Sequence, residues 1–94
     1  MIFRVELPRS AARAFEGAPR PERRRLEKAI DALSPNPRPA GKLIKAIQGT
    51  RDAFLRMRVG DYRIMYEISE ADHVVLILSI IHRKDLDAWL RQRH

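Results

Sequence analysis

Residues 54–68, which read FLRMRVGDYRIMYEI, decide the fold of this 94-residue chain. Two runs with alternating side-chain character, residues 54–59 and 62–68, are separated only by Gly60 and Asp61. A Gly-Asp pair between two such runs predicts a β-hairpin, with a type II′ turn because glycine comes first. We therefore expect two neighbouring antiparallel strands here.

The two-residue turn also fixes which residues lie opposite each other across the hairpin. The expected pairs are Val59 with Tyr62, Arg58 with Arg63, Met57 with Ile64, and Arg56 with Met65. Side chains alternate between the faces of a strand, so an apolar set covers the helices and a polar set lies on the other face. The apolar set is Leu55, Met57, Val59, Tyr62, Ile64 and Tyr66. The other set is Phe54, Arg56, Arg58, Arg63, Met65 and Glu67.

The chain before the hairpin predicts one strand and two helices. Residues 2–7 alternate as a strand does. A short helix capped by Ser10 should end at Gly17, and apolar residues recur at helical spacing over residues 21–33. The proline-rich stretch 34–41 ends the second helix as a stiff loop.

The chain after the hairpin predicts one more strand and a short helix. Residues 74–81 are mostly apolar and rich in β-branched side chains, which is typical of a buried strand. Asp85 is expected to cap a terminal helix that includes Trp89. The sequence thus predicts a single α+β domain over residues 1–94, in the order β-α-α-β-β-β-α. Two N-terminal helices should pack on one face of a small, mainly antiparallel four-stranded sheet.

Composition restricts the classes of function. The chain carries 19 Lys and Arg against 12 Asp and Glu, a formal net charge of +7, and 15 of the cations are arginine. This balance indicates an anionic partner, either nucleic acid or an acidic protein segment, although codon bias would also raise the share of arginine. The absence of cysteine excludes disulfides, thiolate zinc sites and cysteine nucleophiles.

Location and cofactor follow from further absences in the sequence. The apolar run 74–81 is far shorter than the ~20 residues that span a bilayer. No secretory signal is visible, so we expect a cytoplasmic protein without a membrane partner. The three histidines lack metal-ligand spacing, and we expect neither a metal nor a cofactor.

The arginines of the hairpin suggest a site. Arg58 opposite Arg63 places like charges together, a local conflict that is typical of functional sites. The alternative is that the two side chains splay apart in solvent, at a cost of roughly 0–1 kcal/mol. His82 and Arg83 follow the last strand, and antiparallel pairing of that strand with residues 62–68 would bring them near Arg63.

An arginine cluster suits a phosphodiester. In RNA the adjacent 2′-hydroxyl attacks the phosphate, so the protein has only to align the reacting atoms and stabilise the added negative charge. Arginine does the second task but stays protonated. His82 is therefore the candidate for proton transfer.

At these residues the chain resembles the RelE/ParE toxin superfamily, and the RelE branch most. The resemblance covers nearly the whole chain. Its markers are Leu33 with the loop 35–41 and Lys42-Leu43, then residues 56–68, RMRVGDYRIMYEI, and finally residues 81–85, IHRKD. It implies a type II toxin that cleaves mRNA in the ribosomal A site, together with a cognate antitoxin. An extended or helical antitoxin segment would wrap the toxin in a hetero-oligomer.

The resemblance also assigns roles to residues. It places catalytic residues at Arg56, Arg58, Arg63, His82 and Arg83. We expect further RNA contacts from Lys42, Lys45, Lys84 and Trp89. The chain departs from the RelE pattern in two respects. It has no tyrosine near the C-terminus, where Trp89 can supply stacking but no hydroxyl, and Phe54 stands where a basic residue is common.

Two other functions fit the same fold. A ParE-like protein would inhibit DNA gyrase by binding, without nuclease activity, and an inactive module would serve only in assembly with the antitoxin. Fold alone does not separate them. The arginine-rich hairpin face favours RNA cleavage.

Overall fold

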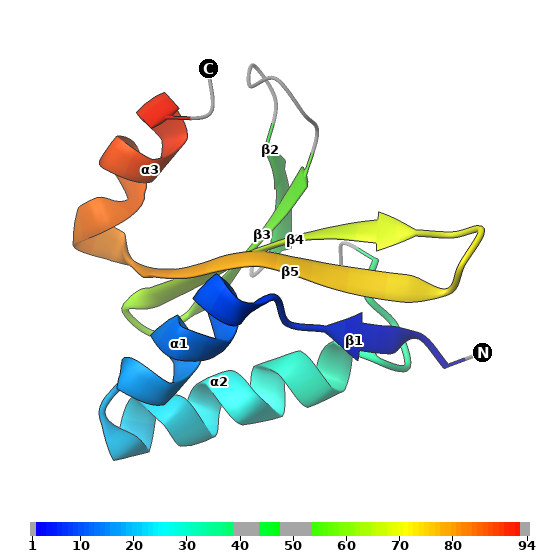
Figure 1. Cartoon of the computed structure of the whole chain (residues 1–94), viewed down its shortest axis with the longest axis horizontal. Coiled ribbons are helices and arrows are strands. Elements are labelled where there is room, and N and C mark those ends of the chain that lie inside the picture. The colour runs from blue at the N-terminus through cyan, green and yellow to red at the C-terminus, as the bar shows by residue number, and fades with distance from the viewer. Residues whose placement is uncertain (1, 39–43, 48–53, 93–94) are drawn as a thin grey trace.

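A computed structural model describes residues 2–38, 44–47 and 54–92, with residues 44–47 described by their backbone. The chain forms one five-stranded sheet in the order β1-β5-β4-β3-β2, with two helices before the hairpin and one at the end (Figure 1). The elements are β1 (Arg4–Glu6), α1 (Arg9–Gly17), α2 (Arg20–Leu33), β2 (Ile44–Ile47), β3 (Phe54–Val59), β4 (Tyr62–Ser69), β5 (Val74–His82), the 3₁₀ turn η1 (Arg83–Asp85) and α3 (Leu86–Gln92).

The predicted α+β class is confirmed, and the sheet is mainly antiparallel. Strand β1 pairs parallel with β5, and every other neighbouring pair runs antiparallel. The sheet has five strands rather than the expected four, because β2 pairs with β3 opposite residues 54–57. A four-residue run after a proline-rich loop is too short for its own periodicity to indicate a strand.

The hairpin register is confirmed residue by residue. Arg58 pairs with Arg63, and the flanking pairs follow as expected. Gly60 has a φ of 58°, the left-handed value required at the first position of a type II′ turn. The apolar face of the hairpin joins the buried core, so the alternation was assigned to the correct faces.

Helices α1 and α2 cover one face of the sheet, and α3 lies on the opposite side (Figure 1). The hydrophobic core lies between the sheet and helices α1 and α2, and it contains the apolar stripe of α2 and residues of the central strands. Its fully buried members include Leu26, Leu33, Ile64, Val75 and Ile77. Prolines stand at the N-caps of α1 and α2, and Ser10 lies inside α1 rather than capping it. No helix in the described residues is long and apolar enough to cross a membrane.

The proline-rich loop is tied to the core by Tyr66. The side chain of Tyr66 is fully buried, and its hydroxyl donates a hydrogen bond to the carbonyl oxygen of Pro37 at 2.8 Å. Burial raises the pKa of Tyr66 to about 12, because the phenolate would be desolvated. On the same side, the Ser34 hydroxyl donates to the carbonyl oxygen of Phe3 at 2.8 Å. The described part of the loop is therefore held by one buried and one partly buried hydrogen bond.

Candidate active site

The sheet face opposite α1 and α2, which we call the open face, carries the arginines of the hairpin. Arg56 and Arg58 alternate with buried Met57 along β3, and Arg63 on β4 pairs directly with Arg58. Arg83 follows β5, beside the start of β4. We call Arg56, Arg58, Arg63 and Arg83 the arginine cluster.

The charges of the other three arginines act on Arg63. The pKa of Arg63 is lowered first by partial burial and then by the positive charges of Arg58, Arg56 and Arg83. The carboxylate of Asp61 acts in the opposite direction but contributes least. A site whose positive charges repel one another in this way is stabilised when an anion binds between them.

The hairpin turn holds the guanidinium of Arg63. Its Nη1 donates to the carbonyl oxygens of Gly60 and Tyr62, each at 2.9 Å. In the described part of the chain, the guanidinium groups of Arg56 and Arg58 have no hydrogen-bonding partner. One cation is thus fixed at the turn, while two keep all their donors for a ligand.

Asp61 connects Arg83 to the same turn. The backbone N–H of Arg83 donates to the carbonyl oxygen of Asp61 at 2.7 Å. The side chains form an ion pair, with Arg83 Nε 3.5 Å from Asp61 Oδ1. The sequence indicates only a turn position for Asp61, because its contact with Arg83 depends on the path of the chain after β5.

His82 lies on the other side of the sheet from the hairpin arginines. It pairs with Tyr62, whereas Arg63 pairs with Ile81, so alternation places the imidazole on the side of Tyr62. The His82 and Tyr62 rings meet edge to face at 5.4 Å. His82 Nδ1 accepts a hydrogen bond from the backbone N–H of Lys84 at 3.2 Å, which leaves Nε2 for any other partner. The structure brings four arginines together but not this histidine.

The turn after β5 has a cap that the sequence did not indicate. His82 caps the 3₁₀ turn η1 that leads into α3. Asp85 is the last residue of η1 and directly precedes α3, and its capping of that helix stays a prediction. A histidine can act as this cap because its unprotonated ring nitrogen is an acceptor, as the oxygen of an aspartate would be.

The residues expected to contact RNA differ in how the structure places them. Lys84 is exposed on η1, next to Arg83. The Trp89 ring on α3 packs edge to face against Phe54 at 5.3 Å, which brings α3 onto the open face. The backbone of Lys45 lies opposite Arg56, and its side chain is outside the description. Lys42 lies outside the described residues altogether.

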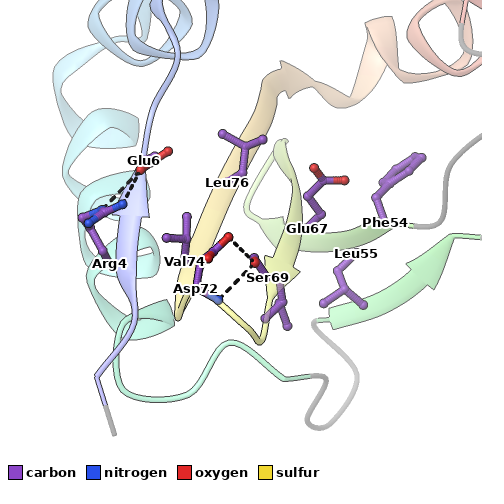
Figure 2. A pocket seen from close by; sticks show the side chains of 10 residues that line it. Arg4, Glu6, Phe54, Leu55, Glu67, Ser69, Asp72, Val74 and Leu76 are labelled. Atoms are coloured by element: carbon purple, nitrogen blue, oxygen red, sulfur yellow. Dashed lines mark hydrogen bonds and ion pairs between the residues drawn. The ribbon is translucent and has the colours of Figure 1, made fainter.

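The other end of the open face is different in chemistry. It holds a cavity of about 750 Å³ between β1, β5, β4 and β3, which we call the acidic cavity (Figure 2). Its lining combines apolar side chains with three carboxylates, and includes Phe54, Val74, Leu76, Glu6, Glu67 and Asp72. Two carboxylates have polar partners there, since Glu6 binds Arg4 at 2.9 Å and Asp72 accepts from the Ser69 hydroxyl at 3.1 Å. No sequence pattern indicates this cavity, because its walls come from four strands.

The arginine cluster is suited to bind and stabilise a phosphate. Its planar donor groups match phosphate oxygens in pairs, and their positive charges favour a phosphorane-like transition state that carries an extra negative charge. Among the described residues, no three His, Asp or Glu side chains come together as metal ligands would.

Known proteins share this sequence pattern and fold. Residues 6–87 match the sequence model of a family described as the ParE toxin of type II toxin-antitoxin system, parDE. A curated relative from Methanocaldococcus jannaschii, named "Putative toxin RelE1", is 27% identical over 85 residues, which cover 89% of this chain and 93% of the relative.

Solved structures of toxin–antitoxin complexes contain similar chains. In the archaeal RelE-RelB complex from Pyrococcus horikoshii OT3, one chain superposes with a TM-score of 0.76 at 32% identity, covering 88% of this chain and 97% of that chain. In the RelBE2 complex from Mycobacterium tuberculosis the TM-score is 0.75 at 23% identity, covering 88% and 100%. The second likeness concerns the fold alone.

Proposed function

The chain belongs to the ParE toxin family of type II toxin-antitoxin systems, in the RelE/ParE superfamily, and on this premise we propose that it is a ribosome-dependent endoribonuclease. It would cleave mRNA in the ribosomal A site and so stop translation and growth. The observation that carries the proposal is the convergence of Arg56, Arg58 and Arg63 on one sheet face, with Arg83 beside them after the end of β5.

The proposed reaction needs no nucleophile from the protein. The 2′-oxygen of the RNA forms a bond to phosphorus, and the bond from phosphorus to the 5′-oxygen breaks. Arg56, Arg58, Arg63 and Arg83 would bind the phosphate and stabilise its added charge. His82 stays the prediction for proton transfer, although its ring lies on the side of Tyr62. Ribosomal RNA or water would otherwise carry the proton.

An antitoxin is the second expected partner. The similar chain from Pyrococcus horikoshii comes from a RelE-RelB complex, which supports a cognate antitoxin that forms a hetero-oligomer with this chain. The formal net charge of +7 favours an antitoxin segment with acidic residues. Both proposed partners would be met in the cytoplasm, which is where we expect the protein to act.

Gyrase inhibition is the alternative function. The matching family model is described as the ParE toxin, and this favours binding of gyrase without RNA cleavage. A surface that only binds gyrase does not need two arginines paired side by side, whereas a site that stabilises the charge of a phosphate does. The arginine cluster therefore supports the nuclease as the first choice.

One experiment separates the two functions. Production of the protein in growing cells, followed by mapping of transcript ends, should reveal new ends inside translated codons within minutes. A gyrase supercoiling assay with the purified protein should show no inhibition. Intact transcripts together with blocked supercoiling would contradict the nuclease and support the ParE-type activity.

A further inference from the structure

Arg83 differs from the other arginines of the cluster because it lies outside the sheet. Arg56, Arg58 and Arg63 are held by strand pairing, whereas Arg83 begins the 3₁₀ turn η1. Its side chain is 64% exposed. A long exposed side chain of this kind samples many rotamers unless other groups restrict it. The position of Arg83 therefore depends on its neighbours.

Asp61 restricts Arg83 at two points. The Asp61 carbonyl oxygen accepts from the Arg83 backbone N–H at 2.7 Å, and the Asp61 carboxylate lies 3.5 Å from Arg83 Nε. The contact at Nε leaves the two terminal nitrogens of the guanidinium for a phosphate. Asp61 also offsets part of the repulsion on Arg63, since its charge raises the pKa that the arginines lower. Asp61 thus contacts Arg83, which lies outside the sheet, and its charge also acts on Arg63 at the turn.

His82 restricts the backbone on the other side of Arg83. Its Nδ1 accepts from the Lys84 N–H at 3.2 Å, and its ring packs against Tyr62. Strand pairing holds His82 itself opposite Tyr62. Arg83 therefore lies between a strand residue that caps the next turn and a hairpin residue that forms an ion pair with its exposed side chain.

We propose that Asp61 and His82 are positioning residues that hold Arg83 at the arginine cluster, where its charge stabilises the negative charge added to the scissile phosphate. The proposal rests on the proposed nuclease function. It gives His82 a role that its place in the fold supports directly, as a neutral acceptor that caps η1. Misplacement of a phosphate-binding group by about 1 Å lowers the rate of a reaction by up to about 100-fold.

The first test changes Asp61 and measures single-turnover cleavage of mRNA on programmed ribosomes. Asp61→Ala should lower the rate at saturating toxin about tenfold, with the half-saturating toxin concentration unchanged. Asp61→Asn keeps a side-chain acceptor at the turn and should recover most of the rate. A normal rate for Asp61→Ala, or a change confined to the half-saturating concentration, would overturn the role of Asp61.

The second test separates positioning from proton transfer at His82. Asparagine can cap the turn through its side-chain oxygen but cannot transfer a proton. If His82 acts by positioning, His82→Asn should therefore retain more of the cleavage rate than His82→Ala, which should lose about tenfold. Equal loss in both variants would show that His82 acts in proton transfer and would overturn its positioning role. His73→Asn is the matched control, because His73 has a φ of 54° that asparagine adopts readily.

A readout without RNA keeps failure of this proposal distinct from failure of the proposed function. The ¹⁵N–¹H NMR signal of the Arg83 Nε–H group reports whether that side chain is held. Asp61→Ala should speed exchange of this proton with water several-fold, with the signals of the hydrophobic core unchanged. Unchanged exchange would overturn the proposal. A wild-type protein that shows the held signal but cleaves no mRNA would instead contradict the nuclease function.

Discussion

The two faces of the β3–β4 hairpin are held by different forces. On the helix-covered face, Met57, Ile64 and Tyr66 are buried in the core. On the open face, Arg58 and Arg63 stand opposite each other and repel, and Arg63 is fixed by carbonyl oxygens of the turn. Neighbouring side chains of one strand thus have different roles, because they point to opposite faces of the sheet. Those on the helix-covered face stabilise the fold, and those on the open face form the candidate site.

The open face itself is also divided. The arginine cluster lies toward the hairpin turn, and the acidic cavity lies toward the opposite ends of β3 and β4. Phe54 lies between these two regions, buried and in contact with Trp89 of α3. On the proposed function, an RNA phosphate would be attracted to one end and repelled from the other, so this charge pattern would give a bound strand a preferred position.

The largest change in stability is expected when a substitution creates a cavity in the core beneath the helix-covered face. Ile64→Ala removes a side chain that is 0% exposed, and should lower the free energy of unfolding by about 2–5 kcal/mol. Urea denaturation measures this loss. Cleavage per folded molecule should not change. Ile64→Val, with an expected loss of about 0.5–1.5 kcal/mol, keeps the test valid if the alanine variant does not fold.

The adjacent residue on the open face should give the opposite result. Arg63→Ala should lower ribosome-dependent cleavage about 100- to 1,000-fold and abolish growth inhibition, with a melting temperature within a few degrees of wild type. Arg83→Ala should act in the same direction. Arg4→Ala is the matched control, since Arg4 lies at the acidic cavity and pairs with Glu6. Toxicity of both cluster variants at the wild-type level would contradict the phosphate site.

Alkaline pH should act on the helix-covered face through Tyr66. Because burial raises the pKa of Tyr66 from 10.0 to about 12, the folded state favours the neutral phenol. This contribution is complete below pH 10 and is lost as the pH rises from 10 to about 12, at a cost of about 2–3 kcal/mol. Tyr66→Phe should lack that part of the loss in urea denaturation at high pH. Parallel loss in both proteins would show that Tyr66 is not responsible.

The difference between the faces also explains what could be predicted from sequence. The hairpin register follows from local information, namely the alternation and the Gly60-Asp61 turn, and it was correct. The side of His82 does not follow from such information. Residues 74–81 are mostly apolar and show no alternation, and a register shift near Met65 changes how β5 pairs with β4. The contact between Asp61 and Arg83 forms only in the assembled sheet, and so does the acidic cavity. No sequence pattern therefore predicts either of them.

The smallest change in stability is expected when one arginine is replaced by glutamine at either end of the open face. Arg58→Gln removes a charge that repels Arg63, and should raise the free energy of unfolding by up to about 1 kcal/mol at low salt. Arg4→Gln removes the ion pair with Glu6 and should lower it slightly. Both changes should shrink in 0.5 M NaCl, because salt screens exposed charges. Opposite signs from the same substitution would establish that the hairpin arginines are kept at a cost in stability. A loss of stability in Arg58→Gln would mean that the cluster is not strained, and its paired charges would no longer indicate an anion site.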